Sequence, residues 1–149
     1  MATEFTFGAG NERISIRIET AKASLDENPS YKNRLESTVN LQIGAFSGAF
    51  KAEFTTEELM VLHQQLIRGI ASHLGTLLFR NAGGDVSLSI VFNGAEAAVI
   101  TGTILPHRMA HASLTFRLDM PETALARTAE ELEDVLHEFP YQPTDVAPL

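Results

Sequence analysis

The fold is decided by residues 46–74, which read FSGAFKAEFTTEELMVLHQQLIRGIASHL. Over residues 46–54 every second residue is apolar or small, and the residues between them are mostly polar. This period of two predicts a strand with one buried face. The side chains predicted to share that face are Phe46, Gly48, Phe50, Ala52 and Phe54.

From Thr55 onward the spacing becomes helical. Thr55 and Glu58 fit a capping box, in which the hydroxyl accepts from the Glu58 amide and the carboxylate reaches back. Gly75 is the expected end of the helix, because glycine readily takes the left-handed conformation that closes a helix. A strand therefore feeds directly into a helix. The predicted apolar stripe is Leu59, Leu62, Leu66, Ile70 and Leu74.

The chain before this stretch predicts further strands. Residues 12–19 and 35–43 alternate in the same way, and the Gly44-Ala45 turn makes 35–43 and 46–54 an antiparallel hairpin. Phe5 and Phe7 fit a short additional edge strand. Residues 20–34 lack any sustained period, and an irregular stretch of this length is often functional.

The chain after it repeats the pattern. Short strands are predicted at 76–79, 86–92, 97–105 and 112–118, with Asn93-Gly94 as a two-residue hairpin turn. A second capping box is predicted from Asp119 to Glu122, followed by a helix that Pro140 ends. The apolar stripe of this helix is Leu125, Ala129, Leu132, Leu136 and Phe139.

One-sided strands are typical of antiparallel sheets, since parallel sheets covered on both faces read as continuous apolar runs. The predicted fold is α+β: a largely antiparallel sheet of meander-like strands with two helices on its apolar face, in the order β-β-β-α-β-β-β-β-α. We expect a single domain over residues 1–139 and a Pro-rich tail at 140–149. The two strand-to-helix units are similar, through internal duplication or because such junctions need the same residue types.

Composition narrows the function. The absence of cysteine excludes disulfides, thiolate zinc sites and cysteine nucleophiles. The formal net charge of -8 opposes binding to nucleic acid or anionic membrane, and it favours either a basic partner or simple solubility. The first residues do not resemble a signal peptide and no stretch is long enough to span a membrane, so a cytoplasmic protein is expected.

The sequence predicts no catalytic residue, metal site or cofactor. His107 and His111 have the spacing of a helical metal pair, but they lie between predicted strands, where this spacing does not align the rings. His73 lies near a helix end, where a cation complements the helix dipole. Ser47 lacks the flanking glycines of a hydrolase elbow.

The second predicted helix carries the one unusual charge feature. It is strongly acidic, and Arg127 is the only nearby base. The cluster is either a solvated face or a docking surface for a basic protein. The candidate partner-binding residues are Glu130, Glu131, Glu133, Asp134 and Glu138.

In the order and spacing of several short motifs, the chain resembles the WapI-type immunity proteins of bacterial polymorphic toxin systems. The resemblance spans about residues 12–140. The motifs are Phe46-Ser-Gly48 with Phe50-x-Ala52, Thr56-x-x-Leu59, Leu114-x-Phe116, Asp119 with Thr123-x-Leu125, and Phe139-Pro140.

The resemblance implies a non-catalytic protein that binds and neutralises a cognate toxin, which the acidic charge suggests is a basic nuclease domain. The alternative is a small enzyme or ligand-binding domain whose site is assembled from scattered residues. A deep pocket holding perturbed titratable groups would favour that alternative. A homodimer is compatible with either.

Overall fold

The structure is a computed structural model that describes residues 3–24, 28, 31–106 and 112–143. Two antiparallel four-stranded sheets alternate with two helices along the chain. The first sheet has the order β1 (Glu4–Ala9), β2 (Glu12–Ala21), β3 (Arg34–Ile43) and β4 (Phe46–Thr55), with a 3-10 turn at Lys22–Ser24. Helix α1 (Thr56–Ser72) follows it. The second sheet has the order β5 (Leu74–Arg80), β6 (Val86–Asn93), β7 (Ala97–Ile104) and β8 (Leu114–Pro121), and α2 (Glu122–Glu138) follows it.

This arrangement confirms the α+β class and corrects two details. The strands form two sheets, where one was expected. Four strands, where the predicted order had three, precede α1, because the segment with Phe5 and Phe7 is a full strand paired along β2. Both rings are completely buried.

Both predicted hairpins are confirmed. β3 pairs with β4 along its length, and β6 pairs with β7 from Val86↔Ile104 to Phe92↔Ala98. The β6–β7 turn differs from the predicted Asn93-Gly94 turn. Asn93 belongs to β6 and pairs with Leu74 of β5, so residues 94–96 connect the two strands. Gly94 and Glu96 both take positive φ to close the turn, at 81° and 58°.

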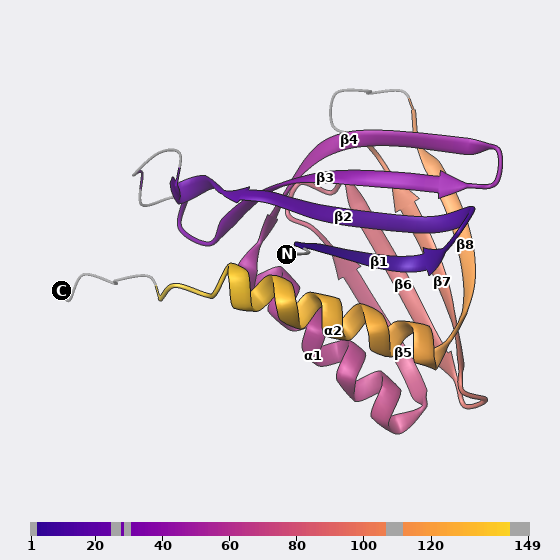
Figure 1. Cartoon of the computed structure of the whole chain (residues 1–149). Helices are drawn as coiled ribbons and strands as arrows, with labels where there is room; N and C mark the ends of the chain where they lie inside the picture. Colours follow the sequence, from indigo (N-terminus) through magenta and orange to yellow (C-terminus); the bar gives the residue numbers. More distant parts are fainter. Residues whose placement is uncertain (1–2, 25–27, 29–30, 107–111, 144–149) are drawn as a thin grey trace.

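The two helices lie side by side and run in opposite directions (Figure 1). Helix α1 follows the first sheet but packs along β5 of the second, and α2 follows the second sheet but packs along β1 of the first. The helices and both sheets share one core. Phe54 and Phe79 join the sheets by stacking, with ring centroids 6.1 Å apart.

The apolar face of β4 is only half covered. Ala52 and Phe54 are buried, but Phe46 is 66% exposed and Phe50 is half-buried, so the predicted continuous buried face is wrong at the turn end of the strand. All residues from 46 to 49 are exposed, which places this end of the hairpin outside the core. Phe116, also predicted to be buried, is only 5% exposed.

Helix α1 begins as predicted and ends earlier. The Thr55 hydroxyl accepts from the Glu58 amide at 3.2 Å, which confirms the capping box. The helix ends at Ser72, and His73 takes the left-handed cap that Gly75 was expected to provide. Leu74 is drawn into β5 by its pairing with Asn93, so it leaves the helical stripe and is 63% exposed.

The second predicted capping box does not form. Asp119 lies in β8 opposite Val99, and Pro121 occupies the cap position without a side-chain bond. The Glu122 amide instead donates to the Glu96 carbonyl at 2.9 Å. Val135 is fully buried in α2, whereas Leu136 and Phe139, predicted to face the core, are partly buried at its edge.

The described beginning of the predicted tail contacts the domain. The backbone amide of Gln142 donates to the Asn33 side-chain oxygen, and the Asn33 amide group donates to the Gln142 carbonyl, both at 2.7 Å. The chain just after α2 is therefore held beside the start of β3.

Candidate functional site

The first candidate site is the acidic face of α2. Its carboxylates lie opposite the buried side of the helix, which carries Leu132 and Val135. None of the ion pairs formed among the described residues involves them. Four of the five predicted residues are exposed and form what we call the acidic α2 surface: Glu130, Glu133, Asp134 and Glu138.

The fifth residue, Glu131, is placed differently. Its Oε1 accepts a hydrogen bond from the backbone amide of Thr6 at 3.0 Å, and one turn earlier the Thr128 hydroxyl donates to the Thr6 carbonyl at 2.6 Å. Burial is the main cause that raises the pKa of Glu131. The expectation that all five carboxylates point outward is therefore wrong for Glu131, which attaches α2 to the edge of β1.

A second candidate site is a cavity of about 800 Å³ beside β4. It lies between this edge strand and the turn at residues 81–85, and we call it the β4 seam. Phe50, Ala52 and Pro106 give it apolar walls. Its charged lining residues are the acids Glu36, Glu53, Glu58 and Asp85 and the cations Arg34 and Lys51.

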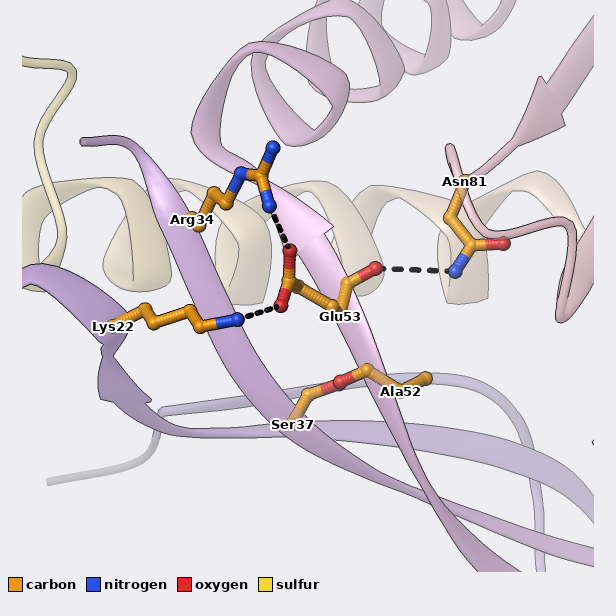
Figure 2. A network of polar contacts seen from close by, with 6 residues as sticks. All are labelled: Lys22, Arg34, Ser37, Ala52, Glu53 and Asn81. Carbon is orange, nitrogen blue, oxygen red and sulfur yellow. Dashed lines mark hydrogen bonds and ion pairs between the residues drawn. The ribbon is translucent and has the colours of Figure 1, made fainter. Parts of the chain in front are cut away.

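Figure 2 shows the polar contacts that hold the wall of the seam. The Glu53 carboxylate binds Lys22 at 3.0 Å and Arg34 at 3.4 Å. The Glu53 backbone carbonyl accepts from the side-chain amide of Asn81 at 3.1 Å, which ties the 81–85 turn to β4. Lys22 and Arg34 are therefore already paired with Glu53.

Of the other three carboxylates that line the seam, those of Asp85 and Glu58 each have one buried oxygen without a hydrogen-bond partner among the described residues. Asp85 is 6% exposed; its Oδ2 accepts from Asn81 at 3.3 Å, but its Oδ1 has no hydrogen-bond partner within the described ranges. Glu58 accepts from the Thr55 hydroxyl at 3.1 Å through Oε1, and the backbone amides of Thr55 and Ala82 also stabilise its charged form. Its buried Oε2 has no close hydrogen-bond partner among the described residues. Burial raises the pKa of Glu58, against the opposing effect of its hydrogen bonds.

The sequence did not point to the seam. The sequence predicts Glu58 only as a capping residue, and residues 81–85 only as the connection between the strands predicted at 76–79 and 86–92. The one available signal was an aspartate directly before a buried strand residue, Val86. The cavity itself forms between segments about 30 residues apart in the chain, such as Glu53 and Asn81, so no local pattern reports it.

One histidine–carboxylate contact joins the helices. His73 Nδ1 lies 2.6 Å from Glu122 Oε1, which links the end of α1 to the first residue of α2. His73 thus has a specific partner in addition to the predicted helix dipole. Among the described residues, no group of three or more histidine and acid side chains is suited to a metal ion, and His107 and His111 lie outside those residues.

The comparisons with known proteins bear on the whole chain. The family model described as the immunity protein WapI-like family matches residues 5–140. No curated protein matches the sequence. Within the described part of the chain, no helix is both long and apolar enough to cross a membrane.

Proposed function

Because the chain belongs to the immunity protein WapI-like family, we propose that it is a non-catalytic immunity protein that binds and neutralises a cognate bacterial toxin domain. The observation that carries this proposal is the extent of the family match, which runs from the second residue of β1 past the end of α2. An immunity protein of this kind must meet its toxin in the same compartment, which we propose is the cytoplasm.

The acidic α2 surface is the proposed contact for the toxin. Its four carboxylates are exposed and free of ion pairs among the described residues, and the whole chain carries a formal charge of -8. Toxins that cleave nucleic acid need a basic cleft to hold a polyanion. Opposite charges on two partners raise the rate of encounter and fix their orientation more than they add affinity.

This proposal is tested by reversing charge without disturbing the fold. The test variant carries Glu130→Lys, Glu133→Lys and Asp134→Lys, and it keeps Glu131 because that residue anchors the helix. We expect unchanged thermal unfolding, because exposed charges contribute little to stability. Association with the toxin encoded beside this protein should slow by about tenfold at low salt, and raised salt should slow the wild type similarly.

A matched control reverses three exposed acids elsewhere, with Glu12→Lys, Glu19→Lys and Glu96→Lys. It changes the net charge by the same amount and leaves α2 intact. If both triple variants associate equally fast, the acidic α2 surface is only a solvated face. If the wild type neither binds the toxin nor rescues cells that express it, the proposed function itself is wrong.

A second candidate function is a ligand-binding domain, and the β4 seam is the observation that favours it. The cavity holds Glu58, whose pKa is raised by burial, beside the buried Asp85. The four acids that line the seam outnumber its two cations, Arg34 and Lys51, which favours a small cationic ligand. This alternative would be supported by two results together: small cationic molecules bind the seam saturably in a titration, and the wild-type protein does not bind the toxin.

A further inference from the structure

We propose that the β4 seam is a receptor for a basic side chain, an arginine guanidinium carried by an extended segment of the partner protein. The proposal rests on the proposed function, because it requires a protein partner. It adds a second contact, distinct from the acidic α2 surface and on the opposite edge of the first sheet.

The first argument is the unsatisfied charge of Asp85. A buried carboxylate is costly unless each oxygen has a hydrogen-bond donor, and a cation is the strongest one. Here one oxygen has a neutral amide from Asn81, and the other has no hydrogen-bond partner among the described residues. Glu58, which also lines the cavity, is better satisfied, because the backbone amides of Thr55 and Ala82 stabilise its carboxylate. A guanidinium carries five N–H donors in a fixed fork that matches a carboxylate.

The second argument is that, in the part of the chain that the structure describes, the cations near the seam form no ion pair with these two acids. Lys22 and Arg34 are bound to Glu53, and Lys22 also lies over the Tyr31 ring at 4.4 Å from its centroid. Lys51 is exposed, and it joins none of the ion pairs among the described residues. Arg80 packs against Gly84 without an ion pair to Asp85.

The third argument is the shape and lining of the seam. Its volume of about 800 Å³ exceeds what one side chain needs, so it has room for adjoining backbone as well. The apolar walls from Phe50, Ala52 and Pro106 suit the methylene stem of an arginine, which packs on apolar surface while its head group is bound. Arginine anchors of this kind dominate many protein interfaces.

The fourth argument is the open edge of β4. This strand is terminal in its sheet. The backbone N–H and C=O groups of successive residues point alternately to β3 and to the open edge. The Ala52 carbonyl accepts from the Ser37 hydroxyl on the β3 side, whereas the Glu53 carbonyl points to Asn81 on the other side (Figure 2). By the same alternation, Ala49 and Lys51 direct backbone groups to the open edge. An extended segment is the occupant that pairs with such an edge.

The test uses a capped peptide, acetyl-Thr-Val-Arg-Val-Thr-amide, titrated into the full-length isotope-labelled protein and followed by backbone amide NMR. Its control carries citrulline, a neutral isostere, in place of arginine. We expect saturable shifts confined to residues 49–58 and 81–86 with the arginine peptide. Citrulline should weaken binding by about tenfold or more, because it removes a charge-assisted hydrogen bond.

Two protein variants complete the test. Asp85→Asn keeps the size of the side chain and removes its charge, so it should weaken arginine-peptide binding about tenfold or more and make the two peptides nearly equivalent. Glu58→Gln should weaken it as well, and gives a second readout if the Asp85 variant fails to fold. Glu130→Gln, on the acidic α2 surface, should leave peptide binding unchanged.

Equal binding of the two peptides, or shifts spread over the acidic α2 surface, would overturn the proposal, because they indicate only general attraction to an acidic protein. The outcome is separable from that of the proposed function. If the wild type protects cells and Asp85→Asn protects equally while the peptide does not bind, the seam proposal alone fails. If the peptide binds the seam but the wild type does not protect, the proposed function alone fails.

Discussion

Glu58 shows how one side chain serves both the fold and a site. Its amide and Oε1 complete the capping box with Thr55 at the start of α1. Its other oxygen is buried and has no close hydrogen-bond partner among the residues that the structure describes, and burial raises the pKa of the carboxyl group. The folded protein therefore holds this proton more tightly than the unfolded chain does, so ionising Glu58 costs stability.

The first prediction concerns the pH dependence of stability. A carboxyl group with a raised folded-state pKa contributes stability below its ordinary pKa and loses it as the pH rises through the raised value. Glu58→Gln keeps the capping box and removes this loss. Relative to the wild type, the variant should gain stability from acidic to neutral pH, on the order of a few tenths of a kcal/mol because the carboxylate is partly solvated.

Urea unfolding of both proteins between about pH 4 and pH 8 measures this difference. Glu57→Gln, its exposed neighbour, is the control and should show no comparable trend. A difference between wild type and Glu58→Gln that stays constant with pH would contradict the prediction.

At the scale of elements, the edge of the first sheet is protected by a helix. Strand β1 is terminal, and unpaired backbone groups on an edge strand invite pairing with other chains. Helix α2 supplies side chains to both backbone groups of Thr6, through Glu131 and Thr128. These two residues are three apart on a helix, which places them on the same face.

The second prediction is that these contacts attach α2 to the sheet. Thr128→Val and Glu131→Ala should each lower the free energy of unfolding by about 1–3 kcal/mol, because each leaves a partly buried backbone group unsatisfied. Arg127→Ala, an exposed change on the same helix, should have almost no effect.

Hydrogen exchange supplies a local readout for this prediction. The amide of Thr6 should exchange faster in Glu131→Ala than in Thr128→Val, since only Glu131 accepts from that amide. Equal protection of this amide in the wild type and in Glu131→Ala would show that the bond does not hold the helix.

At the scale of the whole molecule, the chain consists of two similar units. Each is a four-stranded antiparallel meander followed by a helix of 17 residues. This architecture accords with the internal duplication weighed from the two strand-to-helix junctions. Each helix, however, packs against the sheet of the other unit, and Phe54 stacks on Phe79 across the two (Figure 1). The units are therefore mutually dependent.

The third prediction follows from this exchange of helices. Fragments 1–73 and 74–149, expressed separately, should each lack a cooperative thermal transition, because the buried stripe of each helix has no sheet to cover. Mixed together, they should recover both the secondary structure and the transition, measured by circular dichroism. A cooperative transition of fragment 1–73 alone would show that the first unit folds without the second.

Local sequence determined the elements of this fold. Period two set the strands and their hairpins, helical spacing set α1 and α2, and Thr55 with Glu58 fixed the start of α1. All four residues of the acidic α2 surface were also readable in advance, because a helical stripe defines its own opposite face. These features depend on residues within a few positions of one another.

Only the tertiary structure decided which surface covers each apolar face. It divided the strands into two sheets, exchanged the helices between them, drew Leu74 into β5 and turned Glu131 toward Thr6, 125 positions away. It also created the β4 seam and left Asp85 half satisfied there. The physical reason is that periodicity reports that a side chain is apolar or polar on its own element. Its partner and its burial are set by segments that meet only when the whole chain packs.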